Sequence, residues 1–282
     1  MSVINTNIKA LVSTNVLNAN NRAMQKTMES LSTGSRINKA SDDAAGLSVR
    51  ENMTSQINGL NAAVRNANDA INMLQTADGA LNEVSDMMQR MRELGTLAQS
   101  DTYSTAQKTA MDNEFQALKS EINRIRDNTQ WNKQGLLTGS GGEVGAGSQF
   151  TFQVGANAAQ QITVTVGNMS TSAAAGQFAT LATKSIATGT AAINAVSALD
   201  VAISILNANR SAIGAGINRL EHAINNLTNV AQNATDSRSR VTDTDYSKAT
   251  SDLAKQQIIA QAATAILAQA NQQPQSVLSL LK

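Results

Sequence analysis

His222 is the only histidine among the 282 residues, and the sequence contains no cysteine. A Ser–His or Cys–His nucleophile pair needs a histidine beside the nucleophile, and a zinc centre usually needs several nitrogen or sulfur ligands. His222 lies between Leu220 and Ile224 in a stretch with helical spacing, which favours an exposed position on the flank of a helix. The sequence therefore predicts no enzyme activity, no metal site and no cofactor.

Two acidic clusters are the remaining candidates for site chemistry. Asp42 and Asp43 could form a carboxylate pair, but acidic residues directly before a helical stretch commonly cap the helix and complement its dipole. Asp243-Thr244-Asp245 resembles the first ligands of a calcium loop, yet the glycine and terminal glutamate of such a loop are missing. We therefore expect a helix cap at the first cluster and a polar break between helices at the second.

The composition favours long helices over a compact globule. Only 2% of the residues are aromatic, one residue is a proline, and the net charge is +1. Coiled-coil seams need only Ala, Leu, Ile, Val and Met, whereas thick cores usually rely on aromatic side chains. The balanced charge predicts no nucleic-acid partner. No apolar stretch approaches the roughly 18 residues of a membrane span, so we also expect no membrane partner.

Apolar residues recur at heptad spacing in four main stretches, which predicts coiled-coil helices. Gly34 ends the first stretch, and Ser104 with Gln107 three residues later is a capping box that starts a further, shorter helix. The seam residues are Val3, Ala10, Leu17, Met24 and Leu31; Met53, Leu60, Ala67, Leu74, Leu81 and Met88; Leu199, Leu206, Ile213, Leu220, Leu227 and Ala234; and Ala249, Leu253, Ala260, Ala263, Leu267 and Ala270.

A segment of different composition separates the long helical stretches. Residues 138–178 are rich in Gly, Ser and Thr, and apolar residues alternate strictly in 150–154 and 162–166. With Gly155-Ala156-Asn157 between them, these two runs predict a β-hairpin. Residues 167–190 show no apolar seam, so we expect their exposed positions to tolerate substitutions and small insertions.

The order of these stretches is roughly palindromic, so the two ends of the chain are expected to pair. We predict a mainly α fold, a long antiparallel coiled-coil helical bundle with paired N- and C-terminal helices and a small β-hairpin insert. The predicted segments are 1–43, 44–137, 138–190, 191–235 and 236–282.

Three segments resemble bacterial flagellins. They are Leu31 to Leu47 (LSTGSRINKASDDAAGL), the hairpin FQVGAN at 152–157, and the C-terminal run DSRSRV at 236–241 with LAQANQQPQSVLSLL at 267–281. The resemblance covers essentially the whole chain except about 138–148 and 167–190. About 50 residues separate the helical halves, so the chain resembles a short form of flagellin without the large variable outer domains.

The resemblance implies a structural subunit that polymerises into the flagellar filament used for swimming. Segments 1–43 and 236–282 would form the inner-tube helical domain, and 44–137 with 191–235 the outer-tube domain. It also implies type III export without a cleaved signal peptide and an extracellular location in the filament. The implied partners are further copies of the chain, an export chaperone, and the filament cap and hook-junction proteins. The alternative is a hook–filament junction protein, because that family resembles flagellin at both ends.

Two sets of residues follow as site predictions. The apolar tail and the terminal seams are expected to drive polymerisation. The Gln89–Leu94 segment resembles the flagellin segment that a host Toll-like receptor binds, and a cytosolic inflammasome sensor is implied as a second host partner. The predicted polymerisation residues are Val3, Leu17, Leu31, Leu267, Val277, Leu278, Leu280 and Leu281, and the predicted receptor contacts are Gln89, Arg90, Arg92, Glu93 and Leu94.

Overall fold

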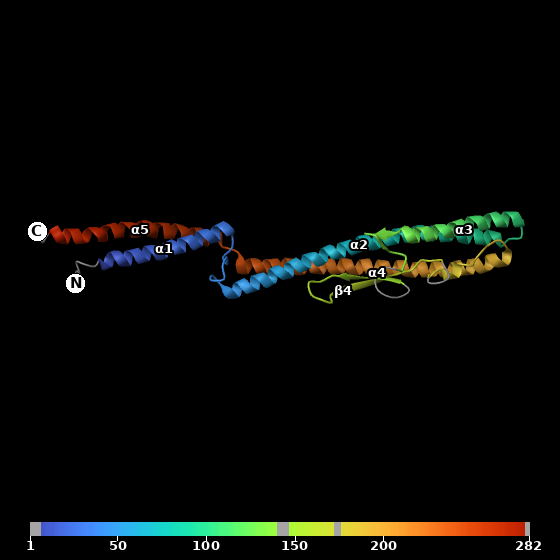
Figure 1. Ribbon diagram of the computed structural model, residues 1–282, viewed down its shortest axis with the longest axis horizontal. Coiled ribbons are helices and arrows are strands. Elements are labelled where there is room, and N and C mark those ends of the chain that lie inside the picture. The colour runs from blue at the N-terminus through green and yellow to red at the C-terminus, as the bar shows by residue number, and fades with distance from the viewer. Residues whose placement is uncertain (1–6, 140–146, 172–175, 280–282) are drawn as a thin grey trace. The chain divides into compact units, whose positions relative to one another are not determined.

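Long helices follow the predicted heptad seams (Figure 1). The computed structural model describes residues 7–139, 147–171 and 176–279, with the backbone alone for 147–148 and 273–279. The helices are α1 (Ile8–Thr33), α2 (Ala44–Ala98), α3 (Thr105–Asn128), α4 (Gly189–Thr242) and α5 (Tyr246–Ser279), with a short 3₁₀ helix η1 (Ala179–Leu181). The strands are β1 (Gln130–Trp131), β2 (Gln134–Gly135), β3 (Gly147–Gln153) and β4 (Gln161–Gly167). The predicted mainly α fold with a small β-hairpin is confirmed.

The chain divides into two compact units. The terminal unit comprises residues 1–55 and 233–282, and the central unit comprises 56–232. The divisions therefore fall inside α2 and inside α4, whereas the segments predicted from the sequence begin at residue 44 and end at residue 235.

In the terminal unit, α1 and α5 pair in antiparallel orientation (Figure 1). The Asn7 side chain donates from Nδ2 to the Ala270 carbonyl at 2.8 Å, and Asn20 Nδ2 donates to the Gln256 carbonyl at 2.8 Å. The two contacts are separated by nearly equal numbers of residues on α1 and α5 but run in opposite directions along the chain, as expected for antiparallel helices. Ala249, Ala263 and Ala270 are the buried α5 residues of this seam, which confirms the predicted pairing of the terminal helices.

The ends of α1 and α2 are capped as the sequence predicts. Gly34 takes the left-handed conformation (φ 68°) that commonly ends a helix at a glycine. Asp43 accepts a hydrogen bond from the Gly46 backbone N–H at 2.9 Å, which caps the start of α2. Between these caps, Ile37 is buried. Its carbonyl accepts a hydrogen bond from Arg50 at 2.8 Å, which holds the turn against α2.

In the central unit, α2 and α4 form an antiparallel coil. Arg210 Nε donates to Asp78 at 2.9 Å, and Arg92 Nε donates to Asp200 at 2.7 Å, so later residues of α2 face earlier residues of α4. The predicted seams are buried, which confirms their register. Their fully or largely buried members are Leu60, Ala67, Leu74, Leu81 and Met88 on α2 and Leu199, Leu206, Ile213, Leu220 and Leu227 on α4.

Helix α3 packs on this coil and begins at the predicted capping box. The Ser104 hydroxyl accepts a hydrogen bond from the Gln107 backbone N–H, and the Gln107 side chain accepts one from the Ser104 backbone N–H at 2.8 Å. Phe115 and Ile122 point from α3 into the core and are fully buried. The three helices therefore share one hydrophobic core.

The predicted hairpin is present as β3 and β4, which pair in antiparallel register with Phe152 opposite Ile162. Alternate residues of β4 are buried, which places one face of the hairpin on the helices. A Cβ at Gly216 of α4 would lie 2.7 Å from Val164 Cγ2, so glycine permits this close approach of the hairpin.

Four apolar residues between 167 and 190 are buried although this segment has no periodic apolar seam. Met169, Phe178, Leu181 and Ile186 are each fully buried in the core of the central unit. Their spacing matches neither the helix nor the strand period, so periodicity could not reveal them. We therefore expect changes at these four positions to be poorly tolerated.

Polar side chains of α3 fasten the same segment. Lys119 Nζ donates to the Ala182 carbonyl at 3.1 Å, and Gln116 Nε2 donates to the Lys184 carbonyl at 3.0 Å. Asp112 Oδ1 accepts from the Ile186 backbone N–H at 2.7 Å. Partial burial lowers the pKa of Lys119 from its ordinary value, although the nearby Asp112 carboxylate acts in the opposite direction.

Helix α4 is long and apolar enough, by length and composition, to cross a membrane, which the sequence analysis did not anticipate. Its seam side chains, such as Leu206 and Leu220, are fully buried against the other helices of the central unit. Core helices of soluble proteins pass the same test of length and composition, so the test by itself does not identify α4 as a membrane span.

Leu206 provides a direct test of the central core. We expect Leu206→Ala to lower the free energy of unfolding by about 2–5 kcal/mol, because it removes a fully buried side chain and leaves a cavity. Val201→Ala, at a half-exposed position of the same helix, is the matched control and should change it far less. Thermal unfolding of the soluble chain followed by circular dichroism measures both. Equal shifts for the two variants would show that the seam register is wrong.

Candidate functional site

The α1–α5 pair exposes many large apolar side chains. None of the α1 residues is fully buried, and Ile8 on α1 and Ile266 on α5 are both 56% exposed. Such side chains are individually common at surfaces, but a row of them along one helix pair marks an interaction face. The exposed large apolar residues of the pair are Ile8, Leu11, Val12, Val16 and Met28 on α1 and Ile258, Ile259 and Ile266 on α5.

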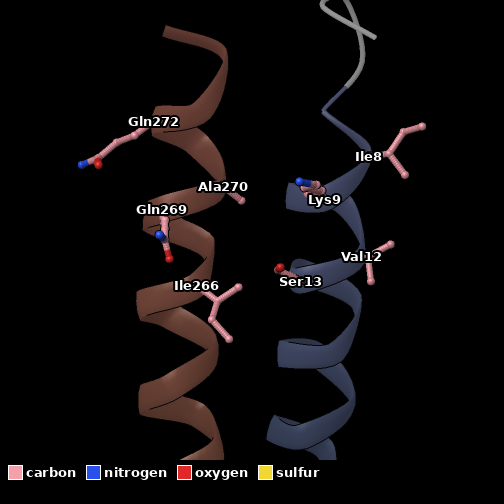
Figure 2. Close-up of a pocket in the computed structure, with 8 residues that line it drawn as sticks. All are labelled: Ile8, Lys9, Val12, Ser13, Ile266, Gln269, Ala270 and Gln272. Atoms are coloured by element: carbon pink, nitrogen blue, oxygen red, sulfur yellow. The ribbon is translucent and has the colours of Figure 1, made fainter. Parts of the chain in front are cut away.

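A groove of about 750 Å³ lies at the end of this pair, between the start of α1 and the later part of α5. Figure 2 shows Ile266 and Ala270 extending from α5 toward α1, with Ser13 facing them. Ile8 and Val12 lie on the side of α1 away from α5 in this view. The groove is also lined by Lys9, Gln269 and Gln272. Its lining combines apolar and uncharged polar side chains with the single cation Lys9, which suits contact with another protein rather than a small charged ligand.

The predicted polymerisation residues occupy a different place on the same pair. Leu17, Leu31 and Leu267 are half-buried along the seam between α1 and α5, so much of each side chain already packs within the chain. Val3, Leu280 and Leu281 lie outside the described residues, and the side chains of Val277 and Leu278 do as well. The exposed apolar residues were missed because they stand off the heptad seam, where polar residues are normally expected.

The predicted receptor-contact segment lies on α2, and its two arginines form three ion pairs. Arg90 donates to Glu114 of α3 at 2.9 Å and to Glu93 at 2.7 Å. Arg92 donates to Asp200 of α4 at 2.7 Å. These hydrogen bonds, first to Glu114 and then to Glu93, raise the pKa of Arg90 above its ordinary value, and the Asp200 bond does the same for Arg92. Both guanidinium groups are therefore positioned by acidic partners on neighbouring helices.

Four of the five predicted contacts are exposed on this surface. Gln89, Arg90, Arg92 and Glu93 face outward, and Gln89, Arg92 and Glu93 line a shallow groove of about 430 Å³. Leu94 does not, because its side chain is only 3% exposed and packs in the central core. The prediction that Leu94 contacts a receptor directly is therefore corrected: it supports the exposed residues from beneath.

The candidates for chemistry act as caps and turns. His222 is exposed on the flank of α4, as predicted. Asp42 accepts a hydrogen bond from Lys26 and from the backbone N–H groups of Lys39 and Asn38, and these bonds lower the pKa of its carboxyl. Among the described residues, no cluster of three or more His, Asp or Glu side chains could hold a metal ion.

Known proteins match the chain along nearly its full length. The model of the bacterial flagellin N-terminal helical region matches residues 4–141, and that of the C-terminal helical region matches residues 196–281. A flagellin of Halalkalibacterium halodurans is 42% identical over 280 residues, covering 99% of this chain and 100% of the relative. The chain belongs to the bacterial flagellin family. The Bacillus subtilis flagellin is 41% identical over 311 residues and is covered to 99%.

Membership in the flagellin family settles the general role. The chain is a structural subunit of the flagellar filament, which lies outside the cell. The full-length match to a flagellin of similar size shows that this is the short form, without large outer domains. Flagellins are structural proteins of the filament.

Among solved structures, the chain is similar to one described as a flagellar hook-associated protein from Vibrio parahaemolyticus. The TM-score is 0.57 at 13% identity, covering 72% of this chain and 100% of that one. At this identity the similarity concerns the fold alone, so it does not support the junction-protein alternative over a flagellin.

Proposed function

We propose that the exposed apolar face of α1 and α5 is the surface that drives polymerisation into the filament. The observation that carries this proposal is that α1 has no fully buried residue while large apolar side chains of both helices are exposed. Neighbouring subunits would bury these side chains, each contributing about 1.5–3 kcal/mol when fully removed from water. A repeated head-to-tail contact with a rotation that does not close produces an open helical polymer.

The apolar tail belongs to the same proposal. Val3, Val277, Leu278, Leu280 and Leu281 would extend the apolar face, while Leu17, Leu31 and Leu267 would hold the pair together along its seam. Export through the type III apparatus without a cleaved signal peptide, an export chaperone, and the cap and hook-junction proteins are also proposed. Family membership supports these partners.

Two isoleucines test the polymerisation face. We expect Ile8→Ser and Ile266→Ser each to raise the critical concentration for polymerisation at least tenfold, because each removes an apolar side chain that neighbours would bury. Asn18→Ser, at an exposed polar position of α1, is the control and should leave it unchanged. Sedimentation of polymer across a concentration series measures all three. Identical critical concentrations would place the interface elsewhere.

We further propose that the monomer is recognised by a host Toll-like receptor through the exposed residues of the Gln89–Glu93 segment. Arg90 supports this most strongly, because its guanidinium is exposed yet held in place by Glu93 and Glu114. Such pre-organised arginines lose little conformational freedom on binding and are common binding hot spots. The cytosolic inflammasome sensor is proposed as a second host partner on family membership alone.

Arg90→Ala tests the receptor proposal. We expect the variant monomer to be at least tenfold less potent in a reporter-cell titration, because truncating a hot-spot arginine commonly costs about 2 kcal/mol or more. Arg65→Ala, at another exposed arginine of α2, is the matched control. Equal potency of the Arg90 and Arg65 variants, with unchanged thermal unfolding of both, would refute the receptor contact and leave the polymerisation proposal intact.

A further inference from the structure

The seam between α1 and α5 does little to choose one register over another. Its buried residues on α5 are alanines, and its partners on α1 are only half-buried. Because the apolar pattern repeats every seven residues, sliding α1 by one heptad would again place apolar side chains opposite one another, with Ala10 opposite Ala260 in place of Leu267. The larger seam side chains, such as Leu17 and Leu31, are only half-buried, so the slide would forfeit little buried surface.

The two asparagine contacts across the seam are equally permissive. Asn7 and Asn20 both donate to backbone carbonyls of α5, not to side chains. Every turn of a helix presents a carbonyl at the same place, so both bonds could form again after a slide of one heptad. The asparagines therefore favour pairing without selecting a register.

The region where the helices end contains contacts of a different kind. The last carbonyls of α1 accept hydrogen bonds from the segment that leads into α5: Thr244 N donates to Gly34 O at 3.0 Å, Thr244 Oγ1 to Ser30 O at 3.3 Å, and Tyr246 Oη to Leu31 O at 3.3 Å. The C-terminus of a helix leaves four such carbonyls without helical partners. Here a distant segment caps α1.

The reverse also holds. The last carbonyls of α4 accept hydrogen bonds from the segment that follows α1: Arg36 N donates to Thr242 O at 2.7 Å, Ser35 Oγ to the same oxygen at 3.2 Å, and Arg36 Nη2 to Val241 O at 2.9 Å. Each of the two helices is thus capped by the segment that follows the other. We call these contacts the reciprocal cap.

We propose that the reciprocal cap sets the register of α1 on α5. Unlike the seam and the asparagine contacts, its bonds join unique positions that have no equivalent seven residues away. Gly34 is required here because it adopts φ 68° and because a Cβ would lie 3.2 Å from Tyr246 Oη. Residues 34–43, which connect α1 to α2, are long enough to permit a slide if the cap is broken.

The register has a consequence for the groove of Figure 2, and this consequence rests on the proposed polymerisation face. A slide of one heptad moves α1 by about 10 Å along α5. Ser13 would then no longer face Ile266 and Ala270, so the groove would lose its present lining. The cap would thereby control a surface that lies at the opposite end of the helix pair.

Disulfide cross-linking tests the register directly, because the described residues contain no cysteine of their own. In the native register, Ala10 lies level with Leu267, three residues on from the Asn7–Ala270 contact. A chain with Ala10→Cys and Leu267→Cys reports this register, and a chain with Ala10→Cys and Ala260→Cys reports the register shifted by one heptad. Each pair is placed in the otherwise unchanged full-length chain and in cap variants, and oxidised as soluble protein.

We expect the unchanged chain to form only the native cross-link. The double variant Arg36→Ala with Thr244→Pro loses cap donors on both sides, so its shifted cross-link should rise at least tenfold. Thr244→Ser keeps both donors of residue 244 and should behave as the unchanged chain. Tyr246→Phe alone, at an exposed side chain whose loss should not unfold the chain, should give a smaller increase.

Two results would overturn the proposal. If the cap variants form the native cross-link alone, the seam itself selects the register. If they form neither cross-link, the cap holds the helices together rather than choosing between registers. Neither readout requires polymer, so the outcome is separate from that of the isoleucine variants; sedimentation of the shifted, cross-linked chain tests the consequence for polymerisation.

Discussion

The α1–α5 seam is too narrow to bury the large apolar side chains that the two helices carry. An alanine seam lets the helices approach closely, but it removes little apolar surface from water, and the entropy of ordering two long helices opposes the pairing. Ile8, Val12 and Ile266 each remain more than half exposed as a result. In the proposed filament contact, neighbouring copies of the chain bury these side chains and supply the stabilisation that the seam lacks.

The central unit, in contrast, buries most of its large apolar side chains within the chain. Its three helices and the hairpin enclose a hydrophobic core in which Leu81, Met88 and Phe115 are completely buried. Whereas the central unit buries these side chains within the chain, the terminal unit is proposed to bury its exposed ones on assembly. The reciprocal cap adds a fixed point to the weaker unit, where seam packing alone leaves the register open. Arg90 and Arg92 lie on the central unit, and their acidic partners hold them in place within the single chain.

Periodic features were predictable from the sequence, and features without a period were not. The heptad spacing predicted the seam that contains Leu206 and Leu220, and the Ser104–Gln107 capping box predicted the start of α3. Both signals come from residues that are close together in the sequence. Phe178 and Ile186 are buried in the core of the central unit although their spacing follows no helix or strand period. The tight β1–β2 turn lacks the glycine that usually signals it, since Asn132 and Lys133 adopt φ 47° and φ 66°. For the site, the six-residue match predicted a contact segment on α2, and the heptad phase was needed to see that Leu94 of this segment faces the core.

Hydrogen exchange measured on soluble chain and on polymer tests the central claim most directly, because it reports the stability of each helix separately. The account predicts that amides of α1 and α5 exchange at least a hundredfold more slowly in the polymer. Amides in the buried stretches of α2 and α4 within the central unit should be strongly protected in both samples. If α1 and α5 were already as well protected in the soluble chain as in the polymer, the terminal pair would be stable by itself and the account would be contradicted.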